Sequence, residues 1–151
     1  KIEAVEKFGE AQVNKWRRGY AIQPPLVELS DPDYPKFDAR YASVPANLLP
    51  RAESLKDVSA RVLPFWLSEI LPLVKQGKKV LIAAHGNSLR ALLKHLERLT
   101  EDEIEGINIP TGLPKIYSLD AEGLAKDTSY VGDPAEVQAR IASVANQTKK
   151  G

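Results

Sequence analysis

The stretch "VLIAAHGNSL", residues 80–89, decides the fold that this sequence predicts. Its first five residues are uniformly apolar, which is typical of a strand buried on both faces in the middle of a parallel sheet. Residues 85–88 then supply a histidine, a glycine, an asparagine and a serine. We expect Asn87 or Ser88 to cap a helix there. A leucine stripe at helical spacing follows: Leu89, Leu92, Leu93 and Leu96.

Working outward, the remaining patterns alternate between helix and strand. Residues 2–18 predict two short helices separated near Gly9, and a proline-dense loop extends from Gly19 to Arg51. A long helix is expected from Ser54 to Gly77, with a capping box at its start and a kink at Pro64. Further expected elements are a short helix from Thr100, a strand at 115–119, a weaker strand near 129–131 and a last helix from Asp133-Pro134. The predicted fold class is α/β, a three-layer arrangement in which helices flank a mostly parallel sheet.

Composition narrows the classes of function. The 151 residues carry 21 Lys and Arg against 20 Asp and Glu, so charge gives no reason to expect a nucleic acid or an anionic membrane as partner. No apolar run approaches the length needed to span a bilayer, and no secretory leader is apparent. Cysteine is absent, which excludes disulfides and thiolate metal sites and suits a cytoplasmic protein. Two histidines are too few for a convincing metal site, so we expect none.

The junction after the run at 80–84 is the first candidate site. Ligands of α/β folds bind where strands end, and the following helix points free N–H groups into the same space. Gly86 lets an anion approach the backbone, and His85 offers a hydrogen-bond donor. These features predict a phosphate or oxyanion pocket. On spacing alone, a histidine that only satisfies its own hydrogen bonds explains the pattern equally well.

Several segments together resemble one family. "LIAAHGNSLRALLKHLE" and "INIPTGLPKIYSLD" are similar to the C-terminal part of the cofactor-dependent phosphoglycerate mutases, in the histidine phosphatase superfamily. "EKFGEAQVNKWRRGY", "PPLVELSDPDYPKFDARY", "AESLKDVSARVLPFW" and "VANQTKKG" resemble further parts of that family. The resemblance covers nearly the whole chain. It identifies residues 1–151 as the C-terminal portion of a single mutase-like domain.

The resemblance implies a reaction. The family interconverts 3-phosphoglycerate and 2-phosphoglycerate through a phosphohistidine, is primed by 2,3-bisphosphoglycerate and needs no metal, because cationic and N–H-rich walls stabilise the transferring group. By the same resemblance His85 holds the phosphoryl group, and Gly86 and Asn87 contact the bound phosphoglycerate. Arg17 and Arg18 would bind the substrate, since a guanidinium group can donate two parallel hydrogen bonds to a carboxylate or phosphate. Lys1 matches a lysine that lines the substrate pocket, and the family implies a homo-oligomer.

One departure from the family matters. The family's nucleophilic histidine belongs to an Arg-His-Gly motif on the first strand, and no such tripeptide occurs in these 151 residues. We therefore expect this chain to be a portion of a mutase that cannot form the phosphoenzyme unless that strand is supplied.

Other interpretations remain open. Arg17 and Arg18 also fit a solvated helix end, where basic residues favour the helix dipole. A bisphosphoglycerate mutase or a phosphatase of the same superfamily would share His85. From another class, a truncated, non-catalytic chain would serve as a binding or dimerisation module. His95, near Lys94 and Arg98, fits a solvated helix face.

Overall fold

A computed structural model describes residues 2–146 of the chain. Helices α1 (Ile2–Phe8) and α2 (Glu10–Arg18) begin the fold, and the break between them lies at Gly9, as predicted. Gly9 has a φ of 80°, a left-handed conformation that glycine adopts without steric cost. The proline-dense loop follows and contains short 3₁₀ turns at Pro35–Phe37, Ala39–Tyr41 and Ala46–Leu48.

The predicted long helix is formed as three joined pieces. They are α3 (Leu55–Phe65), a π-helical turn η4 (Trp66–Ile70) and α4 (Leu71–Lys75). Pro64 lies in the last turn of α3, directly before the π-helical turn. A proline has no N–H to donate, so the ladder is interrupted there, and wider π-type bonding is one way in which a helix continues past an interruption.

Gly77 ends this helical run as predicted. It has a φ of 80°, its N–H donates to the Val74 carbonyl, and the Lys78 N–H donates to the Leu73 carbonyl. These two bonds define a Schellman motif, which satisfies carbonyls that would otherwise lack a partner. The chain therefore leaves α4 in a fixed direction toward residues 79–85.

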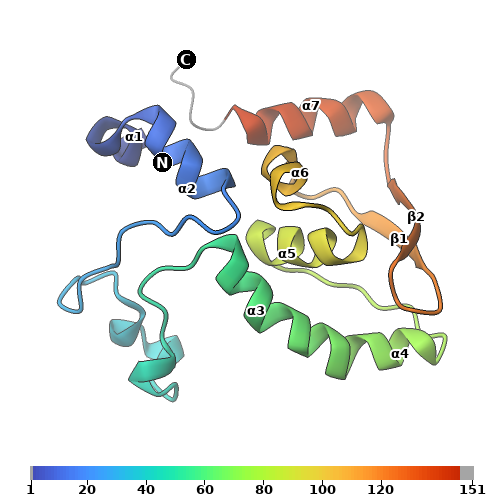
Figure 1. The fold of residues 1–151 in the computed structure, drawn as a ribbon, viewed down its shortest axis with the longest axis horizontal. Coiled ribbons are helices and arrows are strands. Elements are labelled where there is room, and N and C mark those ends of the chain that lie inside the picture. The colour runs from blue at the N-terminus through green and yellow to red at the C-terminus, as the bar shows by residue number, and fades with distance from the viewer. Residues whose placement is uncertain (1, 147–151) are drawn as a thin grey trace.

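Helix α5 (Gly86–Leu96) lies at the centre of the fold, with α3 on one side and α6 (Glu101–Gly106) on the other (Figure 1). Two apolar clusters surround it. The first joins buried residues of α3, α5 and α6: Leu55, Val58, Ala91, Leu93 and Ile104. The second joins the η4–α4 region to the other side of α5: Trp66, Leu71, Leu92 and Leu96. The predicted leucine stripe thus supplies the core, although Leu89 is only half-buried.

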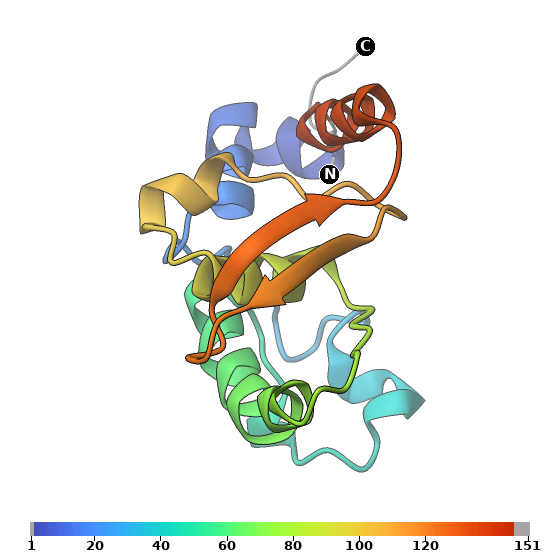
Figure 2. The same cartoon turned by 90° about the vertical axis from the view of Figure 1, so that its right-hand side faces the viewer.

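A β-hairpin and a last helix complete the described residues. Strands β1 (Lys115–Leu119) and β2 (Ala125–Tyr130) pair antiparallel, with Lys115 opposite Tyr130. The hairpin crosses in front of α5 in the second view (Figure 2). Helix α7 (Pro134–Ala145) starts as predicted, because the Asp133 carboxylate accepts from the N–H groups of Ala135 and Glu136. No helix within residues 2–146 is long and apolar enough to cross a membrane.

The predicted central strand at 80–84 is wrong. Among the described residues the sheet has two strands, β1 and β2, which are antiparallel. The mostly parallel, three-layer sheet is therefore not present in them, and the observed fold mixes helices with a small antiparallel sheet. Leu81 is 87% exposed and Val80 is 39% exposed, whereas Ile82 is half-buried against the second cluster. An apolar run becomes a buried strand only where neighbouring strands cover it and accept its hydrogen bonds.

Candidate functional site

His85 occupies the N-cap position of α5. Its backbone is extended, with φ −61° and ψ 146°, and its Nδ1 accepts a hydrogen bond of 3.2 Å from the Asn87 N–H. The N-cap residue is therefore His85, and the prediction of Asn87 or Ser88 as the cap is wrong. A neutral imidazole that accepts at Nδ1 carries its proton on Nε2. The exposed His85 ring thus keeps one N–H donor for an external group.

The first turn of α5 supplies further donors beside His85. The N–H groups of Gly86 and Ser88 belong to the first helical turn, which has no intrahelical acceptors. Nothing lies within 4 Å of the point where a Cβ would stand on Gly86. Space for an anion is therefore open at the positive end of the helix dipole.

Arg17 and Arg18 end helix α2 and are half-buried. The interpretation that they lie on a fully solvated helix end therefore does not hold. Burial lowers the pKa of both guanidinium groups, and for Arg18 the neighbouring charge of Arg17 lowers the pKa further. Arg18 also donates to the Val144 carbonyl of α7 over 3.5 Å. Burial and mutual repulsion both destabilise the charged forms of these two guanidinium groups. A bound anion would stabilise the charged forms.

Arg90 connects the end of α2 to α5, and sequence reasoning missed it. Its side chain is buried, and its guanidinium donates to the backbone carbonyls of Arg17 and Arg18. The available signal was its position three residues before Leu93, which places an arginine on the buried face of a predicted helix. The structure thus joins the arginine pair to the helix that begins at His85.

Two cavities border residues 80–84. One, of about 320 Å³, is lined by Ala83, Ala84 and Ser88 on either side of His85, and by Arg61 of α3. The other, of about 600 Å³, lies between residues 78–82, strand β1 and the leucines of α5. His85 itself lines neither cavity, so the candidate site is an open surface beside the smaller one.

Comparison with known families decides the class of protein. Residues 2–134 match the sequence profile of the histidine phosphatase superfamily, branch 1. The chain belongs to this superfamily. Its members are generally phosphatases or mutases, and membership therefore supports a phosphoryl-transfer enzyme.

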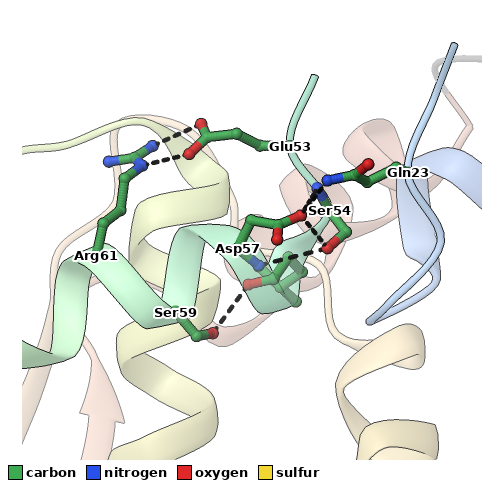
Figure 3. Close-up of polar contacts among 7 residues, drawn as sticks. Gln23, Glu53, Ser54, Asp57, Ser59 and Arg61 are labelled. Carbon is green, nitrogen blue, oxygen red and sulfur yellow. Dashed lines mark hydrogen bonds and ion pairs between the residues drawn. The ribbon is translucent and has the colours of Figure 1, made fainter. Parts of the chain in front are cut away.

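In this member of the histidine phosphatase superfamily, polar contacts fix the start of α3 (Figure 3). Asp57 accepts from the Ser54 N–H at 2.8 Å, from the Ser54 hydroxyl at 2.6 Å and from Gln23 at 2.7 Å. These donors lower the pKa of the Asp57 carboxyl to about 2. They confirm the predicted capping box and tie it to the proline-dense loop.

Arg61 and Glu53 form a two-pronged ion pair at the rim of the smaller cavity (Figure 3). Arg61 Nε lies 2.6 Å from one carboxylate oxygen of Glu53, and Arg61 Nη2 lies 3.0 Å from the other. The pairing raises the pKa of Arg61. Glu53 therefore has a structural partner, and the positive charge of Arg61 is already matched.

The remaining candidates are less informative. Lys1 lies outside the described residues, as do Lys149 and Lys150 of the segment "VANQTKKG" that resembles the family. Within residues 2–146, no group of three or more His, Asp or Glu side chains is placed to hold a metal ion. His95 is half-buried rather than solvated, and desolvation lowers its pKa.

Proposed function

We propose that this chain provides the phosphoglycerate-binding part of a 2,3-bisphosphoglycerate-dependent mutase, which interconverts 3-phosphoglycerate and 2-phosphoglycerate. The observation that carries the proposal is the link between two donor groups: the His85 end of α5 and the arginine pair of α2, joined through Arg90. Membership of a superfamily of phosphatases and mutases supports the same reaction class.

The donor set suits the chemistry of the substrate. A phosphoglycerate carries a phosphate and a carboxylate, so it needs two separate groups of cations or N–H donors. The Nε2–H of His85 and the N–H groups of Gly86 and Ser88 suit a phosphoryl group, because they are preorganised donors at one helix start and nothing lies within 4 Å of the Cβ position of Gly86. The guanidinium groups of Arg17 and Arg18 suit a carboxylate or a second phosphate.

The same donors fit the primer, 2,3-bisphosphoglycerate, which carries two phosphates and a carboxylate. When bound, the primer supplies the phosphoryl group that charges the enzyme. The residues of this chain would hold it through charge and N–H donation, and the chemistry of the donor set requires no metal ion.

The nucleophile is a separate question. The sequence contains two histidines and no Arg-His-Gly tripeptide. We assign to His85 the role of holding and stabilising the phosphoryl group. A test of turnover must therefore supply a segment that carries an Arg-His-Gly strand.

The test compares His85→Ala with His95→Ala. With that segment supplied, we expect His85→Ala to lower kcat about a hundredfold or more, because a preorganised donor to the transferring group is lost. His95→Ala, on the same helix, should change kcat little. Near-normal turnover of His85→Ala in a coupled assay for 2-phosphoglycerate would contradict the assignment.

A phosphatase of the same superfamily is the second candidate, and one observation favours it. His85 is exposed and lines neither cavity, so water has access to the bound phosphoryl group. The two functions differ in product. Isomerisation leaves the total of phosphate esters unchanged, whereas hydrolysis releases inorganic phosphate, and a phosphate-release assay run beside the mutase assay separates them.

A further inference from the structure

Arg90 is a buried cation whose hydrogen bonds go to backbone carbonyls. Its side chain is 4% exposed. Nη1 donates to the Arg17 carbonyl and Nη2 donates to the Arg18 carbonyl, each over 3.3 Å, and Nη2 also donates to the Ile104 carbonyl over 2.7 Å. One guanidinium group therefore connects three helices: α5, on which it lies, the last residues of α2 and the end of α6.

Electrostatics opposes this placement. Burial first, and then the charge of Arg18, lower the pKa of Arg90 to about 10, with a partial compensation by Glu105. Replacing a buried charge by an apolar side chain of similar volume is often neutral or stabilising. The contacts of Arg90 therefore suggest a role in fixing geometry in addition to packing.

The carbonyls that Arg90 contacts are those at the end of a helix. The last four carbonyls of a helix have no intrahelical donor and carry the negative end of its dipole. Helix α2 ends at Arg18, where the Gly19 N–H donates to the Lys15 carbonyl. A Cβ on Gly19 would stand 2.7 Å from that same carbonyl oxygen, so the turn is closely packed. Arg90 thus fixes the end of α2 against α5.

We propose that Arg90 is a positioning residue for anion binding. It holds the backbone at Arg17 and Arg18 so that their side chains and the first turn of α5 act on the same ligand. Arg90 itself does not touch the ligand, because it is buried and both of its terminal nitrogens are occupied by carbonyls. This inference depends on the proposed function, since it names what aligns the two donor groups of that site.

The experiment compares three single variants with the wild-type chain: Arg90→Met, Arg90→Lys and Leu96→Ala. Methionine keeps much of the volume and removes the donors, and lysine keeps the charge but has no planar fork to span three carbonyls. Leu96 lies on the same helix with the same 4% exposure, but in the apolar cluster with Trp66. Leu96→Ala is therefore the control for loss of stability alone.

Two measurements are made on each variant. Calorimetric titration with 3-phosphoglycerate, and separately with inorganic phosphate, gives Kd. Amide hydrogen exchange reports local opening at residues 16–20. We expect Arg90→Met to raise Kd for 3-phosphoglycerate about tenfold and to speed exchange at 16–20, because the hydrogen bonds that hold these carbonyls are lost. Arg90→Lys should lie between Arg90→Met and wild type, and Leu96→Ala should change neither quantity at matched loss of thermal stability.

The outcomes separate the inference from the function on which it depends. If Leu96→Ala raises Kd as much as Arg90→Met does, or if Arg90→Met leaves either Kd or exchange at 16–20 unchanged, the positioning role is overturned. If wild type binds neither probe, the proposed function fails, and the exchange data alone then decide whether Arg90 fixes the end of α2. If Arg90→Met does not fold, Arg90→Lys carries the same comparison.

Discussion

Residues 80–85 and helix α5 are adjacent in sequence and both contain apolar residues, yet most of these are buried in α5 and exposed in the segment before it. In α5, Ala91, Leu92, Leu93 and Leu96 are buried between α3, α6 and the hairpin. In the preceding segment, Leu81 is 87% exposed and no residue is fully buried. A helix satisfies its own backbone hydrogen bonds and needs only an apolar surface to pack against, whereas a strand needs neighbouring strands as well.

The difference also explains how the candidate site is held. His85 lies where the loosely packed segment meets the packed helix, and its imidazole caps that helix. Arg17 and Arg18 are held from the packed side, through Arg90. The site is therefore anchored by α5, and residues 80–84 contribute little to its geometry.

The largest effect should come from the packed side. Leu93 is 4% exposed in the cluster with Ile104, and Leu93→Ala should lower the free energy of unfolding by about 3 kcal/mol, because it removes buried surface and leaves a cavity. Chemical denaturation measures this value. A loss below about 1 kcal/mol would mean that α5 is not packed as described.

A smaller effect on stability should arise at Gly77, where helix α4 leads into the segment before α5. Gly77 has a φ of 80°, so Gly77→Ala should cost about 1 kcal/mol of stability, the penalty for a Cβ in the left-handed region. Gly86 is the matched control, since it lies in the first turn of α5 with open space around it. Gly86→Ala should leave the thermal midpoint nearly unchanged while weakening phosphate binding. Equal loss of stability in both variants would remove the distinction.

The third effect appears only in acid. The folded-state pKa of Asp57 is lowered to about 2, first by the Ser54 hydroxyl and then by Gln23. The resulting stability is present above the unfolded pKa of about 3.9 and is lost as pH falls toward 2. Asp57→Asn should therefore flatten the dependence of the thermal midpoint on pH between about 4 and 2. Gln23→Ala, which removes one donor, should have a partial effect, and an unchanged slope in Asp57→Asn would contradict the assignment.

The smallest effect should come from the exposed segment. Leu81→Lys should change the free energy of unfolding by less than about 0.5 kcal/mol, because the leucine is already in contact with solvent. Ile82→Ala should cost more, since Ile82 packs against the second cluster. A large loss for Leu81→Lys would show that residues 80–84 are covered in solution.

The sequence by itself determined the local structure. The capping box at Ser54, the short helix from Thr100, the glycines at 9 and 77 and the leucine stripe of α5 are all found where their patterns indicated. The physical reason is that caps, turns and helical faces depend on residues within a few positions of one another. For the same reason, the segment at His85 could be recognised as a helix start beside possible anion donors.

Only the tertiary structure decided which apolar segment is buried in the core. It also decided that Arg90 is a buried residue that joins helices. The run at 80–84 looked like a central strand, but pairing depends on neighbours that its own residues do not specify. Arg90 was not singled out, because its partners at residues 17, 18 and 104 come close only when three helices pack together. Strand pairing and long-range hydrogen bonds depend on distant segments, and a pattern within ten residues does not identify these partners.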